Sequence, residues 1–275
     1  MNTETAIEKL AFPEGPRWYD GRLWFSDFGQ RVVRTADLDG TLTEVARVEA
    51  RPSGLGWLPD GSLLVVSMSD RRLLRQQGDA LVTHADLSRY TDAHCNDMVV
   101  SAEGNAYVGH MGFDLRARPR RVMPAELILV RPDGSSQVAA GDLLFPNGVV
   151  LTRDGRTLIV AETFGQRLTA FDVRPDGTLA GRRVFASLLG RSPDGICLDR
   201  EGAVWVADAM ARACVRVREG GEITDVIETK RGCYACALGG DRGRTLFLCT
   251  ADDYDPSALE RASGAIETVE VEVPA

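Results

Sequence analysis

The sequence predicts an all-β protein, a six-bladed β-propeller with four antiparallel strands in each blade. Two observations lead to this prediction. One signature occurs six times: a small-residue turn, an apolar strand, an x-Asp/Glu-Gly turn and a second apolar strand. Its copies start 39 to 51 residues apart, which is the repeat length typical of propeller blades. No stretch sustains the 3.6-residue apolar periodicity of an amphipathic helix.

The signature accounts for the first two strands of each unit. Its six copies begin at Pro13, Pro52, Cys95, Pro146, Pro193 and Cys233. In the copy PDGICLDREGAVWVADA, a Glu-Gly pair separates two apolar runs. Such a pair between apolar runs is typical of a β-hairpin turn. Each copy therefore predicts one hairpin.

A weaker hairpin signal lies between the copies and accounts for the third and fourth strands. It has the sequences DLDGTLTEV, RPDGSSQVA, RPDGTLAGR, REGGEITDV and RASGAIETV, with RQQGDALVT as a degenerate form. Residues 4–11 and 265–273 are both candidates for the outer strand of the last blade, and the sequence leaves the choice open. Because the units share one axis, we expect residues 1–275 to form a single domain.

Composition narrows the classes of function. The chain has 275 residues, of which 44% are hydrophobic and 26% charged, as in ordinary globular proteins. The net charge of −8 argues against binding to nucleic acid or to an anionic membrane. No apolar run approaches the ~18 residues of a membrane span, and the N-terminus lacks the features of a secretory signal. We therefore expect a cytoplasmic protein, with Cys233 and Cys236 of the CYAC sequence as buried strand thiols.

The second residue of each signature forms a ring at one mouth of the central channel. The six residues are Glu14, Ser53, Asn96, Asn147, Asp194 and Tyr234. Each of them, taken alone, would be expected to cap a strand end or to bond loop backbone. Two carboxylates and two amides around one axis are, however, a set of hard oxygen donors. The pattern predicts one divalent cation, calcium first, with magnesium, manganese, zinc or iron as alternatives.

The second strand of each signature returns to the same mouth. Its last residues are Asp27, Ser67, His110, Glu162, Asp208 and Thr250. His110 is the only histidine among them. A lone histidine at a strand end is more often a satisfied polar group than a catalyst. The basic insertion at residues 111–124 follows it, and a lid and a solvated surface loop are both open interpretations.

Four motifs carry a family resemblance over essentially the whole chain: EGPRW at 14–18, ND at 96–97, PNGV at 146–149 and SPDGICLDREGAVWVAD at 192–208. In order and spacing they resemble the regucalcin/gluconolactonase/luciferin-regenerating enzyme family. The resemblance implies a six-bladed propeller with one divalent cation in its channel. The family includes calcium- or zinc-dependent sugar lactonases, and a phosphofluoridase with a similar metal site is related to it.

By motif, Glu14, Asn147 and Asp194 resemble the family's metal ligands, and Asp194 also matches the base or nucleophile. Asn96 resembles the residue that helps to ligate the metal or holds substrate and water. His94 stands where sugar lactonases often have arginine, and Tyr234 stands near the position of a phosphofluoridase histidine. We therefore expect Asn96, His94, His110 and Tyr234 to contact the substrate.

Metal-dependent opening of a sugar lactone or small organic lactone is the leading functional hypothesis, with Asp194 accepting a proton from water. The sequence contains no G-x-S-x-G, H-E-x-x-H or P-loop motif. Hydrolysis of phosphotriesters or aryl esters at the same metal is one alternative. A non-catalytic binding module of the NHL type is another, because PDGICLDREGAVWVAD also resembles NHL repeats.

Overall fold

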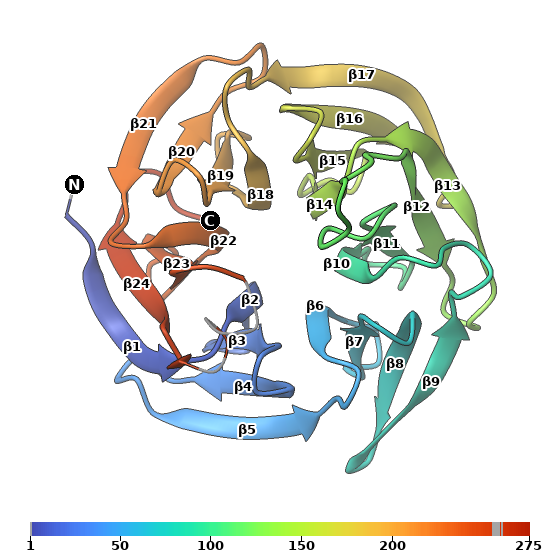
Figure 1. The fold of residues 1–275 in the computed structure, drawn as a ribbon, viewed down its shortest axis with the longest axis horizontal. Coiled ribbons are helices and arrows are strands. Elements are labelled where there is room, and N and C mark those ends of the chain that lie inside the picture. The colour runs from blue at the N-terminus through green and yellow to red at the C-terminus, as the bar shows by residue number, and fades with distance from the viewer. Residues whose placement is uncertain (1, 255–258, 260) are drawn as a thin grey trace.

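The protein is a β-propeller whose blades surround one central axis (Figure 1). The structure, a computed structural model, describes residues 2–254, 259 and 261–275. Its described strands form six sheets of four strands each, with antiparallel pairing within a blade. The predicted fold class, blade number and strand number per blade are confirmed.

The first three blades run outward from the axis in chain order. Blade 1 consists of β2 (Pro13–Tyr19), β3 (Arg22–Asp27), β4 (Val32–Ala36) and β5 (Leu42–Arg47). Blade 2 consists of β6 (Pro52–Trp57), β7 (Leu63–Ser67), β8 (Arg72–Gln77) and β9 (Ala80–Asp86). Blade 3 consists of β10 (Cys95–Val100), β11 (Ala106–His110), β12 (Ala125–Val130) and β13 (Ser136–Leu143).

The remaining blades continue around the ring, and the last of them combines both ends of the chain. Blade 4 consists of β14 (Pro146–Leu151), β15 (Thr157–Glu162), β16 (Arg167–Val173) and β17 (Leu179–Ser187). Blade 5 consists of β18 (Pro193–Leu198), β19 (Val204–Asp208), β20 (Ala213–Val217) and β21 (Ile223–Glu228). Blade 6 consists of β22 (Gly232–Gly239), β23 (Thr245–Ala251), β24 (Gly264–Glu270) and β1 (Glu4–Leu10).

Both candidate closing strands are used, in different positions. The C-terminal strand β24 is the third strand of blade 6, and the N-terminal strand β1 pairs outside it. Ile7 lies opposite Ile266, and Leu10 lies opposite Gly264. The N-terminal segment is therefore the outer strand, and the C-terminal segment lies one place further in.

The apolar core is divided among the interfaces between neighbouring blades. Leu64 and Val66 of blade 2, for example, pack in one buried cluster with Val108 and Ile128 of blade 3. The cluster around Leu10 joins blade 6 to blade 1 in the same way. Burial of such side chains contributes roughly 1.5–3 kcal/mol each, so a blade is stabilised chiefly by its neighbours.

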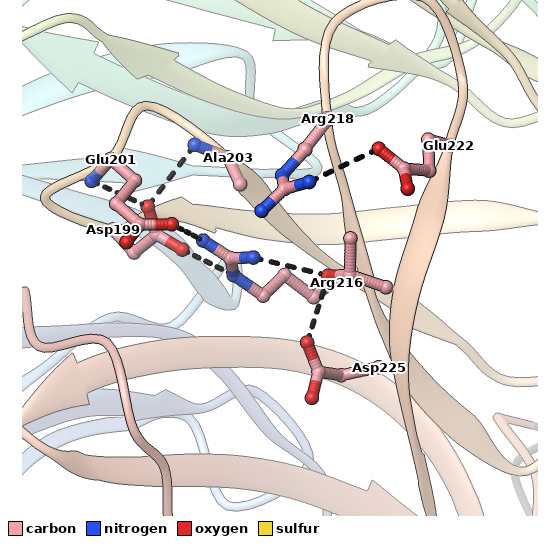
Figure 2. Close-up of polar contacts among 8 residues, drawn as sticks. Asp199, Glu201, Ala203, Arg216, Arg218, Glu222 and Asp225 are labelled. Carbon is pink, nitrogen blue, oxygen red and sulfur yellow. Dashed lines mark hydrogen bonds and ion pairs between the residues drawn. The ribbon is translucent and has the colours of Figure 1, made fainter.

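A buried ion-pair network holds the end of blade 5 that lies far from Asp194 (Figure 2). The Arg216 guanidinium, only 5% exposed, donates to Asp199 at 2.6 Å and to Glu201 at 2.8 Å. It also donates to the Thr224 hydroxyl at 3.1 Å. Asp199 in turn accepts the backbone N–H of Ala203 at 3.1 Å. The network connects the turn at Glu201 and Gly202, between β18 and β19, to the outer strands β20 and β21.

No helix in the described part of the chain has the length and apolar character needed to cross a membrane.

We predict that Leu10→Ala destabilises the ring at its closure. Leu10 is fully buried and clusters with Phe25, Ala235 and Ile266. Truncation should lower the free energy of unfolding by about 2–5 kcal/mol because it leaves a cavity, and urea denaturation measures the change. Leu38→Ala is the matched control, since Leu38 is 53% exposed and should change stability little. Equal effects of the two substitutions would contradict the assigned role of β1.

Candidate functional site

The six ring residues lie near the start of the innermost strands, which line the central axis (Figure 1). In each blade the second strand ends beside the start of the innermost strand. Pro13 pairs with Asp27, Cys95 with His110, and Pro193 with Asp208. Both sets of polar residues predicted from the repeat are therefore brought to one mouth of the channel.

A chain of side-chain hydrogen bonds connects the ring positions of blades 2, 3 and 4. The Ser53 hydroxyl donates to Asn96 Oδ1 at 3.3 Å, and Asn96 Nδ2 donates to Asn147 Oδ1 at 2.8 Å. Asn147 Nδ2 then donates to the Thr163 hydroxyl at 3.2 Å, which donates to the Pro193 carbonyl at 2.8 Å. This chain ends next to Asp194 and fixes both amides. Because an amide oxygen has two lone pairs, Asn147 Oδ1 can still accept a further partner.

Thr163 is a site residue that the sequence interpretation missed. It directly follows the end of β15, and the corresponding residues of the other blades are apolar: Phe28, Met68, Met111, Ala209 and Ala251. The signal that could have identified Thr163 is therefore its polarity at a position that is otherwise apolar.

The two ring carboxylates, Glu14 and Asp194, are half-buried, and their charges interact. Burial, and then the charge of Asp194, raise the pKa of Glu14 well above its usual value. Burial also raises the pKa of Asp194 well above its usual value, against the hydrogen bond from Asn147. Ionised carboxylates in such surroundings repel each other, and a divalent cation would neutralise both.

The donor set fits a hard divalent cation. Two carboxylates and two amide side chains supply oxygen atoms only, as calcium and magnesium prefer. Within residues 2–254, 259 and 261–275, no three or more His, Cys, Asp or Glu side chains are grouped so that they could hold a metal ion. A metal bound at the ring would therefore depend on amide oxygens in addition to Glu14 and Asp194.

An ion pair below the ring was also missed. Arg17 Nη2 donates to Asp97 Oδ1 at 2.7 Å, and the two residues belong to the EGPRW and ND motifs. The residue that follows the ring residue is small in the other five blades: Gly15, Gly54, Gly148, Gly195 and Ala235. The charge of Asp97 at an otherwise small position could have indicated a special role. Its partner Arg17, however, lies 80 residues away in the sequence.

The carboxylates at the ends of the second strands bind loop backbone at the mouth. Asp27 accepts the N–H groups of Ala11 at 2.9 Å and Phe12 at 3.0 Å. Asp208 accepts the N–H of Ala211 at 3.1 Å and pairs with Arg191 at 3.3 Å. These residues hold the loops that surround the ring.

His110 holds both ends of the insertion. Its Nδ1 lies 3.1 Å from the N–H nitrogen of Gly112, and its Nε2 lies 3.0 Å from that of Glu126. Burial lowers the pKa of His110 to about 4, so the ring is neutral at pH 7 and accepts at one nitrogen at a time. His110 thus contacts the backbone at both ends of the insertion, and its contact with a substrate stays a prediction.

His94 lies on the wall of a cavity beside the ring, which has a volume of about 1070 Å³. The cavity is also lined by His110, Phe113, Arg116 and Tyr254, and by no ring residue. Burial, and then the charges of Arg51 and Arg116, lower the pKa of His94. His94 and His110 are thus brought together, but separately from the carboxylates.

Tyr234 belongs to an aromatic cluster at the mouth. Its ring centroid lies 4.5 Å from that of Phe12, which lies 4.4 Å from that of Phe28. Phe113 and Phe145 belong to the same apolar cluster. Burial raises the pKa of Tyr234, so its hydroxyl stays protonated. The cluster gives the polar ring an apolar border.

The insertion at residues 111–124 packs across the mouth. Phe113 contacts Phe164, with ring centroids 5.4 Å apart, and the Arg120 guanidinium lies 5.9 Å from the centroid of the same ring. Arg116 lies 5.4 Å from the centroid of Tyr254. The segment thereby joins blade 3 to loops of blades 4 and 6.

Comparisons with known proteins identify relatives over most of the chain. A family model described as an SMP-30/Gluconolactonase/LRE-like region matches residues 12–252. A 6-deoxy-6-sulfogluconolactonase of Pseudomonas putida is 27% identical over 265 residues, which cover 91% of this chain and 87% of that protein.

Solved structures have the same fold. A gluconolactonase from Xanthomonas campestris aligns with a TM-score of 0.78 and 25% identity, covering 98% of this chain and 89% of the other. A calcium-binding protein, regucalcin, from Agrobacterium tumefaciens aligns with a TM-score of 0.83 and 20% identity, covering 100% and 96%.

We predict that His110→Ala loosens the insertion. The substitution removes the ring that contacts the Gly112 and Glu126 amides at the two ends of the segment. Trypsin should then cleave after Arg116, Arg120 and Arg121 several-fold faster than in the wild type, as followed by mass spectrometry. His84→Ala is the control, because His84 contacts the Arg131 carbonyl on another surface. If both variants resist trypsin as the wild type does, His110 does not anchor the segment.

Proposed function

Since the chain belongs to the SMP-30/Gluconolactonase/LRE-like family, with residues 12–252 matched, we propose that it is a lactonase-type hydrolase that opens a cyclic ester with one divalent cation. The observation that carries this proposal is the ring, where the half-buried carboxylates Glu14 and Asp194 adjoin the linked amides Asn96 and Asn147. The related proteins named as gluconolactonases support the reaction class.

Glu14, Asn147 and Asp194 would hold the cation, with Asn96 as an additional ligand or as a binding group for substrate and water. When bound, the cation polarises the lactone carbonyl and lowers the pKa of water. Calcium is the first candidate because the donors are oxygen atoms and because a structural relative is named as a calcium-binding protein. Zinc, magnesium, manganese and iron are the alternatives.

Asp194 is the proposed general base. It would take a proton from the water whose oxygen adds to the lactone carbonyl carbon. The ring C–O bond then breaks, and the proton ends on the released alkoxide, giving a hydroxy acid. A carboxylate that binds the cation is a weak base, so this role of Asp194 would depend on the cation also lowering the pKa of the attacking water. The hydrogen-bond chain that ends at Pro193 holds the strand that carries Asp194.

The substrate would lie between the ring and the aromatic cluster. Asn96 would orient it from below, and Tyr234 with Phe12 would cover its apolar face. Neutral His94 and His110, which both line the cavity, would contact it from that side. A sugar lactone or small organic lactone fits this combination of polar floor and aromatic border.

Hydrolysis of phosphotriesters or aryl esters at the same ring is the second candidate function. The observation that favours it is the aromatic cluster of Phe12, Phe28, Phe113, Phe145 and Tyr234, because aromatic side chains bind apolar leaving groups well. A side-by-side assay of lactones, an aryl ester and a phosphotriester distinguishes the two candidates. A protein that binds no metal and hydrolyses none of these compounds would instead fit the NHL-like binding module.

We predict that Asp194→Asn abolishes most lactone hydrolysis. The loss of a general base should lower kcat by about 10²–10⁴-fold, as measured with a pH indicator across a lactone panel. Thermal unfolding checks that the variant is folded. Asp79→Asn, which changes an exposed aspartate, is the matched control and should keep wild-type kcat. Full activity of Asp194→Asn would rule out the assigned role.

We also predict that removal of divalent cations stops activity and lowers Tm. A ligand that binds only the native state stabilises it by mass action, by about 2.7 kcal/mol at a concentration of one hundred times Kd. Treatment with EDTA should therefore lower Tm by several degrees, and added calcium should restore both Tm and activity. Differential scanning fluorimetry and elemental analysis provide the measurements. A metal-free protein that is indifferent to EDTA would refute the proposed centre.

A further inference from the structure

A positive charge fixed by hydrogen bonds lies near the ring carboxylate Glu14. Arg17 follows Glu14 by three residues on β2, and its guanidinium reaches past blade 2 to blade 3. Nη2 donates to Asp97 Oδ1 at 2.7 Å and to the Met98 carbonyl at 2.6 Å. Nη1 donates to the Pro16 carbonyl at 2.8 Å. The two side chains are 21% and 9% exposed, so Arg17 and Asp97 form a largely buried ion pair.

Blade 2 leaves room for this pair because Gly54 has no side chain. A Cβ atom at Gly54 would lie 2.8 Å from Asp97 Oδ1 and 2.5 Å from the Met98 nitrogen. Both distances are too short for van der Waals contact. The glycine is therefore needed for Asp97 to take the position in which it meets the guanidinium.

The pair acts electrostatically on both ring carboxylates. Asp97 faces Glu14 and Asp194 as a like charge, and Arg17 faces Glu14 as an opposite charge. Glu14, Asp194, Asp97 and Arg17 together carry a formal charge of minus two. Asp208, which also acts on Asp194, is paired with Arg191 and leaves this sum unchanged. That charge matches a divalent cation. Without Asp97 the sum would be minus one, and without Arg17 it would be minus three.

We propose that Arg17 and Asp97 are a positioning pair that sets the cation affinity of the ring. This inference rests on the proposed function, because it assumes that Glu14 and Asp194 hold a divalent cation. The charge of Asp97 offsets the repulsion that the Arg17 guanidinium would exert on the cation. The two members therefore act in opposite directions on metal binding.

The test uses charge-neutralising variants that keep hydrogen-bonding groups: Asp97→Asn, Arg17→Gln and the double variant. Asp97→Asn leaves the guanidinium uncompensated, so Kd for Ca²⁺ should rise about tenfold or more. Arg17→Gln leaves an additional carboxylate near the site, so Kd should fall by a similar factor. In the double variant the formal charge is again minus two, and Kd should return toward the wild-type value. Isothermal titration of the EDTA-treated protein with CaCl₂ measures all four constants.

A purely structural pair would give a different result. In that case both single substitutions would lower Tm and leave Kd unchanged, or would change Kd in the same direction. Either result overturns the inference. Arg17→Lys keeps the charge but loses the planar fork, so it should lower Tm and keep wild-type Kd. If Arg17→Lys weakens Ca²⁺ binding as much as Asp97→Asn does, charge is not the cause and the inference also fails.

Two comparisons make the outcome specific. The pair Arg216→Gln and Asp199→Asn disrupts another buried ion pair, at the opposite end of β18 from Asp194, and should lower Tm without changing Kd.

Wild-type protein is titrated first. If it binds no Ca²⁺, Mg²⁺, Mn²⁺ or Zn²⁺, the proposed function fails. If it binds one of them and the variants do not show opposite shifts, the positioning role alone fails.

Discussion

Convergence of six innermost strands on one axis is the constraint on which the site depends. Each ring residue lies at the start of its own strand, and consecutive ring residues are separated by a whole blade. They meet only because every blade buries its face against the next one, as in the cluster that joins blade 2 to blade 3. Blade 6 completes this arrangement by combining β1 with β24. The chemistry of the mouth is therefore a property of the closed ring.

The repeat was enough to predict the blades and the positions of Glu14, Asn96, Asn147 and Asp194. Turn residues at regular spacing define hairpins, and the hairpins define the register at the channel. Local sequence signals could not predict which terminal segment is the outer strand of blade 6. The two segments have equally good strand patterns, and only their pairing with each other in the fold decides their positions.

Residues whose roles depend on distant partners could not be assigned from the sequence. Arg17 meets Asp97 across 80 residues, and Thr163 acquires its role from Asn147 and the Pro193 carbonyl. The contacts of His110 with the two ends of the insertion were not predicted either, because the repeat does not specify the path of that segment. Its contact with a substrate stays a prediction. These cases share one physical reason, since an irregular segment or a long side chain chooses its partner only in the folded chain.

The position of β1 also has a consequence for the order of events during synthesis. The strand β1 pairs with β24, which is synthesised about 250 residues later. At roughly 5–20 residues per second, this strand waits on the order of 13–50 s for its partner. Until β24 has been made, blade 1 has an uncovered face toward the missing blade 6. The nascent chain therefore exposes apolar surface through most of the synthesis of the propeller, and the closed ring of polar residues forms late.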